Sequence, residues 1–81
     1  MKLPRNLTGA QLIKALEQLG SQPTRQAGSH VRLTCQLPKE HHLTVPLYDP
    51  VRIGTLAAIL ADVASHHGMT REALTNKLFA K

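Results

Sequence analysis

Two segments of alternating polarity constrain the fold of this chain more than any other feature. Their apolar side chains fall at every second position: Val31, Leu33, Cys35 and Leu37 in the first, and Leu43, Val45 and Leu47 in the second. Successive side chains of a β-strand point to opposite faces, so this period predicts two strands with one buried face and one wet face. Turn-forming residues 38–40 lie between the segments and predict an antiparallel hairpin.

A third, shorter strand is expected just before the hairpin. It covers residues 24–26 and is restricted to an edge of the sheet by Pro23, which cannot donate a backbone hydrogen bond. A turn at Ala27 and Gly28 leads from it into the next strand. The solvent-facing side of that next strand carries His30 and Arg32.

Helices are predicted before and after these strands in the sequence. Thr8 and Gln11 have the spacing of a capping box, and the apolar residues that follow recur at helical spacing, which predicts a helix over residues 9–19. A second apolar stripe predicts a helix that is capped by Gly54 or Thr55 and runs to about residue 65. Residues 69–78 predict a short third helix with Thr70 as its N-cap.

The order of these elements predicts an α+β fold: a helix, a three-stranded antiparallel sheet and a second helix, with a short C-terminal helix added. A chain of 81 residues is expected to form one domain over residues 1–81, with a core at 7–65 and a helical appendage at 69–81. Two helices on one face of the sheet would leave the other face open to solvent. Any chemistry is therefore expected on an open surface or in a shallow groove.

The charge of the chain points to a polyanionic partner. Ten Lys and Arg residues against five Asp and Glu give a net charge of +5, and the isoelectric point is near 10.0. Nucleic acid is the usual partner of such a domain, while an anionic membrane surface or an acidic protein are the rivals. With one Tyr, one Phe and no Trp, base stacking is not expected to dominate RNA binding.

The cysteine content and the hydropathy of the chain favour a cytoplasmic protein. Cys35 is the only cysteine, so no disulfide within the chain is possible, as suits a reducing compartment. The N-terminal residues lack an apolar run of signal-peptide length, and no segment approaches the length of a membrane span.

His30 is the leading catalytic candidate. Histidine changes its charge near neutral pH and can take a proton from a ribose 2′-hydroxyl or give one to a leaving oxygen. Gly28 would let a phosphate approach the backbone, and Ser29 offers a hydroxyl and an amide to it. Arg25 and Arg32 could hold the phosphate, with Lys14, Lys39 and Arg52 extending the basic track. The competing interpretation is that these residues are ordinary solvated side chains.

The remaining polar candidates give weaker signals. His42 and Tyr48 are possible second catalytic groups, although Tyr48 is as readily explained by packing at the sheet edge. Adjacent histidines on a strand point to opposite faces, so His41 and His42 are not expected to share a metal ion. The pair at residues 66–67 is expected to interact with the end of a helix or to be exposed. The sequence therefore predicts neither a metal site nor a cofactor.

Several of these segments together resemble the HicA family of toxins. They are the start of the first helix (residues 7–16), the Arg-Gln-Ala-Gly-Ser-His run at 25–30, Leu-Thr-Val-Pro-Leu at 43–47 and Gly-Thr-Leu-Ala-Ala-Ile-Leu at 54–60. The resemblance covers about residues 7–65. It implies a fold like the double-stranded-RNA-binding domain. It also implies an mRNA endonuclease (mRNA interferase) of a type II toxin-antitoxin system, neutralised by a HicB-type antitoxin.

This resemblance assigns the catalytic role to His30, the histidine of the Gly-Ser-His segment. The chain departs from the family in two ways. Many relatives have a histidine shortly after the Val-Pro segment, where this chain has Tyr48 and Asp49. Most relatives also end soon after the second helix, whereas this chain adds residues 69–81, which suggests an extra surface for the antitoxin or for self-association.

Three hypotheses about function follow from the sequence. In the favoured one, the chain cleaves mRNA without a metal, with His30 as acid or base. In the second it is a non-catalytic RNA-binding module of the same fold, which grips RNA by shape and phosphate charge. In the third its basic face only docks an acidic protein. Cleavage of bound RNA separates the first hypothesis from the others.

Overall fold

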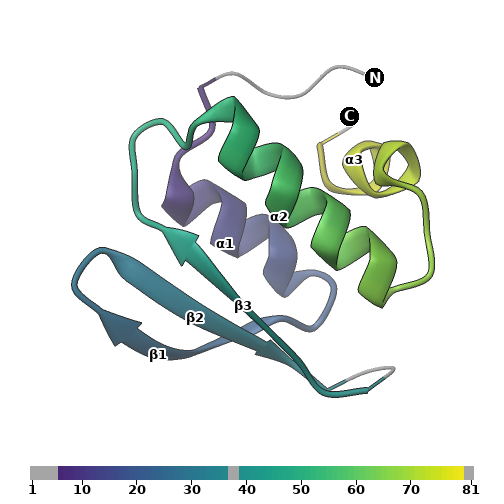
Figure 1. The fold of residues 1–81 in the computed structure, drawn as a ribbon, viewed down its shortest axis with the longest axis horizontal. Coiled ribbons are helices and arrows are strands. Elements are labelled where there is room, and N and C mark those ends of the chain that lie inside the picture. Colours follow the sequence, from purple (N-terminus) through teal and green to yellow (C-terminus); the bar gives the residue numbers. More distant parts are fainter. Residues whose placement is uncertain (1–5, 37–38, 80–81) are drawn as a thin grey trace.

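A computed structural model describes residues 6–36 and 39–79 of the chain. The elements are α1 (Gly9–Glu17), β1 (Gln22–Ala27), β2 (His30–Cys35), β3 (His41–Pro46), α2 (Ile53–His66) and α3 (Arg71–Phe79). This order confirms the predicted α+β fold of a helix, a three-stranded antiparallel sheet and a helix, followed by a short C-terminal helix. Figure 1 shows α1 and α2 on one side of the sheet, with the other side uncovered.

The sheet has the strand order β1-β2-β3, and both pairings are antiparallel. Val31, Leu33 and Cys35 face the helices and are buried, as the alternation predicts. Leu37 lies outside the described residues. The edge strand β1 is longer than predicted because its pairing with β2 continues past an irregularity between Pro23 and Arg25 and reaches Gln22.

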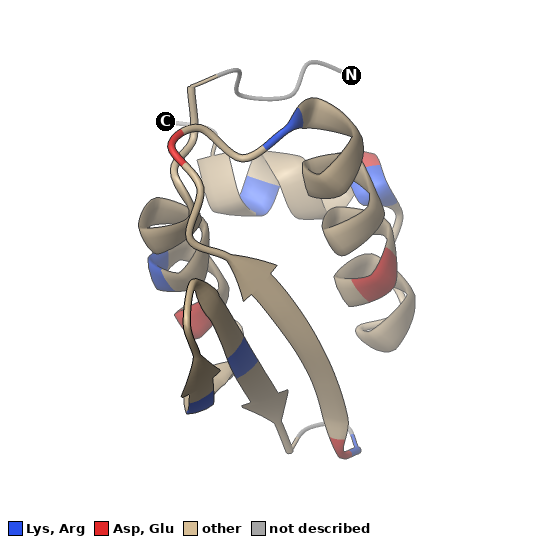
Figure 2. Ribbon diagram, turned by 60° about the vertical axis from the view of Figure 1, so that its left-hand side comes forward, with Lys and Arg blue, Asp and Glu red and all other residues tan. Residues whose placement is uncertain are grey.

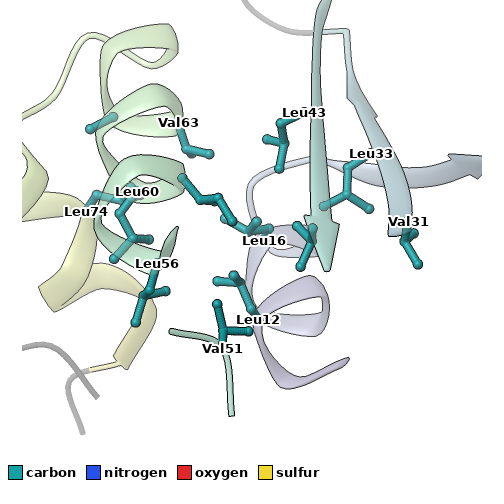
Figure 3. Close-up of a cluster of buried hydrophobic side chains, with 13 residues drawn as sticks. Leu12, Leu16, Val31, Leu33, Leu43, Val51, Leu56, Leu60, Val63 and Leu74 are labelled. Carbon is teal, nitrogen blue, oxygen red and sulfur yellow. The ribbon is translucent and has the colours of Figure 1, made fainter. Parts of the chain in front are cut away.

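A single hydrophobic cluster joins the sheet to all three helices (Figure 3). Its largest fully buried members come from every layer: Leu12, Leu16, Leu33, Leu56, Leu60, Leu74, Val45, Val51 and Val63. Leu74 of α3 is 0% exposed, so the C-terminal helix packs into the same core as the elements of residues 7–65. Thr70 caps α3 by accepting a hydrogen bond from the backbone N–H of Ala73 at 3.0 Å. None of the described helices has both the length and the hydropathy to cross a membrane.

The capping box at the start of α1 is present as predicted. Gln11 N–H donates to Thr8 Oγ1 at 3.1 Å, and Thr8 N–H donates to Gln11 Oε1 at 2.9 Å. Two N–H groups that a helix start leaves without intrahelical partners are thereby satisfied. The cap fixes where α1 begins.

Replacing Thr8 by alanine is therefore expected to lower the free energy of unfolding by about 1 kcal/mol. Serine at the same position keeps the hydroxyl and should recover most of the loss. Urea denaturation of the three proteins measures the effect. Equal stability of the wild type and Thr8→Ala would show that the capping bonds contribute nothing net.

Three further expectations about element ends and burial were wrong. α1 ends at Glu17, and residues 18–20 form a turn that closes with Gly20 at a φ of +91°. Neither Gly54 nor Thr55 caps α2, because the helix begins earlier: Arg52 is its N-cap and makes no side-chain capping bond. Leu47 is 37% exposed, because β3 ends at Pro46 and the chain leaves the sheet before the alternation is complete.

Candidate nucleic-acid interface

His30 is the first residue of β2 and lies exposed on the uncovered face of the sheet. The turn before it consists of Gly28 and Ser29. Gly28 has a φ of +59°, in the left-handed region that favours glycine. Gln26 Nε2 donates to the Gly28 carbonyl at 3.0 Å and holds the turn. A Cβ at Gly28 would meet no atom within 4 Å, so the surface beside His30 is open to a ligand.

The segment after β3 brings Tyr48 next to His30. Leu47 N–H donates to the Ser29 carbonyl at 2.6 Å, and Gly9 N–H donates to the Tyr48 carbonyl at 2.9 Å. These two bonds tie the segment to the turn on one side and to the start of α1 on the other. The rings of His30 and Tyr48 meet edge to face, with centroids 6.2 Å apart. Tyr48 is 44% exposed, so both side chains can reach one ligand.

Arg25 and Arg32 are direct cross-strand partners on β1 and β2, and both are exposed. Among the described residues, neither is paired with a carboxylate. Figure 2 shows basic residues and no acidic ones on these two strands. Like charges opposite one another destabilise a sheet, and an anion such as phosphate between them would relieve the repulsion.

Arg32 also lies close to His30 along β2. The two residues are separated by one position on the same strand and share the open face. Their backbones are therefore about 7 Å apart, a span that one nucleotide phosphate and its ribose can bridge. The structure thus brings together His30, Ser29, Gly28, Arg25 and Arg32, the residues singled out from the sequence.

His42 lies on the same face at the opposite end of the sheet. It pairs with Thr34 in the register, about 13 Å along β2 from His30. Both its ring nitrogens are engaged: Nδ1 is 2.9 Å from Thr34 Oγ1, and Nε2 is 2.7 Å from Glu40 Oε2. His42 is thus too distant to act with His30, and Tyr48 is the better placed of the two candidates for a second catalytic group.

The outlying basic residues do not form one continuous track with the arginines. Lys14 lies on α1 and lines an apolar groove with Leu78 and Phe79 of α3. Arg52 lies at the start of α2, and Lys39 lies in the connection between β2 and β3. The concentrated positive charge of the open face therefore comes from β1 and β2.

A second group of titratable residues lies away from this face. Cys35, His66 and His67 each offer a ligand atom, and these atoms lie within 4.8 Å of one another. Both histidines are half-buried rather than simply exposed at the helix end. Burial, followed by the charges of His66 and His41, lowers the pKa of His67, which favours its neutral form. The sequence offers no signal for this group, because Cys35 is distant from the histidines along the chain.

Comparison with known proteins identifies the family of the chain. Searches among curated proteins and among solved structures give no match. The family model described as the HicA toxin of bacterial toxin-antitoxin systems matches residues 9–64. The matched region begins with α1, includes the whole sheet and the Gly-Ser-His turn, and ends within α2. The chain therefore belongs to the HicA family and is a toxin of a bacterial toxin-antitoxin system.

Proposed function

We propose that the chain is an endoribonuclease that cleaves mRNA on the open face of its sheet, with His30 as a catalytic residue. The observation that carries the proposal is the pairing of His30 with Tyr48 directly beside the arginines of β1 and β2. An imidazole and a phenol can transfer protons, and two guanidinium groups can stabilise the charge on a phosphate, which together suit phosphodiester cleavage. The open face can accommodate a nucleic-acid strand without a deep pocket.

The chemistry needs no metal if the RNA supplies its own nucleophile. The 2′-oxygen forms a bond to the adjacent phosphorus, the bond from phosphorus to the 5′-oxygen breaks, and the products are a 2′,3′-cyclic phosphate and a 5′-hydroxyl. His30 in its neutral form takes the proton of the 2′-hydroxyl. The leaving 5′-oxygen receives a proton from Tyr48 or from water.

Arg25 and Arg32 hold the phosphate and stabilise the charge that builds up on it in the transition state. Ser29 and Gly28 let the strand approach closely at the turn, through a hydroxyl, a backbone amide and the absence of a Cβ. The arginines lie on two paired strands, and Gly28 and Ser29 form the turn that joins these strands, so the spacing of the four residues is fixed.

Neutralising the two arginines is expected to weaken RNA binding and its dependence on salt. The double variant Arg25→Gln, Arg32→Gln loses two phosphate contacts, and each lost contact lowers the slope of log affinity against log salt by about 0.7 for single-stranded RNA. The fold should be as stable as before or more so, since a like-charge pair is removed. Fluorescence anisotropy at several salt concentrations measures both changes.

Lys14→Gln is the matched control, because Lys14 lies in the groove between α1 and α3 rather than on the open face. It removes one positive charge and should leave the slope nearly unchanged. If the loss of RNA affinity per removed charge is the same in Lys14→Gln as in the double arginine variant, only net charge matters and the open face is not the RNA site.

The toxin-antitoxin assignment implies a partner that neutralises this protein. We propose that a HicB-type antitoxin covers the face around His30 and inhibits by occlusion. An acidic surface on the antitoxin would match the arginines of β1 and β2. Protection of Tyr48 and Arg32 from chemical modification in the complex tests this contact.

Incubating the purified protein with labelled RNA in EDTA distinguishes the ribonuclease hypothesis from the hypothesis of a non-catalytic RNA-binding module. Cleavage to a 2′,3′-cyclic phosphate supports the ribonuclease, and a substrate with 2′-deoxyribose at the cleavage position should then stay intact. Salt-dependent binding without cleavage would favour the non-catalytic module.

A further inference from the structure

The C-terminal end of α2 and the end of the β2–β3 hairpin meet on the helix-covered side of the sheet (Figure 1). Cys35, the last residue of β2, is 1% exposed and points away from the open face. His66 ends α2 and His67 caps it. The three side chains come from distant parts of the sequence, and the fold alone brings their ligand atoms within 4.8 Å of one another.

We infer that Cys35, His66 and His67 form a binding site for a zinc ion. A thiolate and two imidazoles are a ligand set that zinc prefers, and with water in the fourth position they complete a tetrahedral shell. Zinc–sulfur and zinc–nitrogen bonds of about 2.3 and 2.1 Å place tetrahedral ligands about 3.3–3.8 Å apart. The ligand atoms therefore need to close in by about one ångström, which side-chain rotation can supply.

The ring of His67 is the observation that points most directly to a ligand. Its Nε2 atom is buried and has no hydrogen-bond partner among the described residues. A buried polar nitrogen without a partner is costly, and a bound metal ion would satisfy it.

The backbone at the end of α2 holds both histidines in place. Met69 N–H donates to the Ala64 carbonyl at 2.9 Å, and Gly68 N–H donates to the Ser65 carbonyl at 3.2 Å. These two bonds form a Schellman motif, with Gly68 in the left-handed conformation at a φ of +67°. The motif ends the helix after His66, so His67 has left helical geometry and can turn toward its neighbour.

His41 at the start of β3 supports the arrangement from the other side. Its ring stacks on that of His66, with centroids 4.3 Å apart, and its Nε2 lies 3.2 Å from Asp62 Oδ1. The Asp62 carboxylate thereby holds the His41 ring, and the stacked His41 ring limits the orientations open to His66. The half-buried histidines leave a path from solvent, while Cys35 closes the inner side of the site.

Zinc binding is coupled to loss of the Cys35 proton and to the stability of the fold. Cys35 Sγ donates to the Leu19 carbonyl at 3.6 Å, and on binding the thiol gives its proton to the buffer as the thiolate bonds to zinc. The ion would join the end of β2 to the end of α2 at a point about 17 Å along the strand from His30. Its role is structural, and the site does not depend on the ribonuclease proposal.

The test uses the full chain, first stripped with EDTA and then freed of the chelator. Cobalt titration of the wild type should give one equivalent of binding, with the d–d bands of a tetrahedral ion and a thiolate charge-transfer band. Zinc affinity is then measured by competition with a chromogenic chelator. Zinc at about 100 times its dissociation constant should raise the unfolding midpoint by about 10 °C or more.

Two variants and two controls decide the outcome. Cys35→Ser should abolish the charge-transfer band. His67→Gln should lower the affinity for zinc by more than the roughly 10–100-fold that is typical when a residue that only supports a ligand is lost. His42→Gln removes a histidine of the open face and should bind zinc as the wild type does, as should His30→Ala.

The proposal fails if the wild type binds no zinc at micromolar concentration, or if cobalt gives no charge-transfer band. It also fails if affinity survives in His67→Gln or is lost in His42→Gln, since surface histidines would then explain the binding. His67 is half-buried, so its variant keeps the test decisive should the buried Cys35→Ser change prevent folding. Zinc binding in a chain that cleaves no RNA would refute the proposed function and leave the metal site standing.

Discussion

Replacing His30 by alanine is expected to lower RNA cleavage by about 10²–10⁴-fold, the usual contribution of a general acid or base. His30 is exposed at the start of β2, and its ring meets that of Tyr48 edge to face, so the fold should be preserved. Single-turnover cleavage by purified protein in EDTA measures the loss. Expression of the variant in cells should no longer arrest growth, whereas the wild type should arrest it.

His42→Ala is the matched control for this prediction. His42 is also an exposed histidine on the open face, but it lies at the other end of the sheet, with Thr34 and Glu40 as its partners. Its loss should leave cleavage within about threefold of the wild type, because it adds no general acid or base at the reacting phosphate. Equal cleavage by the wild type and His30→Ala would remove His30 from the mechanism.

Tyr48→Phe separates two roles of the tyrosine. Phenylalanine keeps the ring that meets His30 but removes the hydroxyl. A strong loss of cleavage, with RNA affinity unchanged, would make Tyr48 the proton donor to the leaving oxygen. Unchanged cleavage would leave that proton to water and limit Tyr48 to packing against His30.

Gly9→Ala is expected to lower the free energy of unfolding by about 2 kcal/mol or more. A Cβ at Gly9 would collide with the backbone carbonyl of Pro46, and it would lie 2.8 Å from the Leu47 Cα. Backbone cannot move aside as a flexible side chain can. The start of α1 would have to withdraw from the end of β3. Thermal and urea unfolding measure the loss, expected at about 4–8 °C per kcal/mol.

The same substitution should also disturb the candidate site. Gly9 N–H donates to the Tyr48 carbonyl at 2.9 Å, so displacement of α1 would release the segment that places Tyr48 beside His30. Cleavage by the folded fraction of Gly9→Ala should therefore fall below that of the wild type.

Gly54→Ala provides the control with the opposite sign. Gly54 lies in α2, and a Cβ there would meet nothing within 4 Å. Alanine loses less conformational freedom than glycine on entering a helix, so this variant should gain about 0.5–1 kcal/mol. If Gly9→Ala and Gly54→Ala change the free energy of unfolding in the same direction, the tight contact at Gly9 is not the reason that a larger residue is disfavoured there.

The sequence by itself determined the type and order of the elements of this fold, and it determined which site residues lie on the open face of the sheet. Alternation through residues 30–35 and 42–46 specified strands with a wet face, since strand geometry fixes side-chain direction at every second residue. The Thr8 and Gln11 capping box fixed the start of α1 through hydrogen bonds between residues three apart. The position of His30 and Arg32 on the open face follows from the same period of two.

Only the tertiary structure decided what depends on contacts between distant residues. The end of β3 exposed Leu47 although the alternation placed it inside, because strand length is set by pairing and by what covers the face. Tyr48 reached His30 through the bonds of its segment to Ser29 and Gly9. The approach of Cys35 to His66 and His67 has no sequence signal, since the packing of α2 against the sheet creates it.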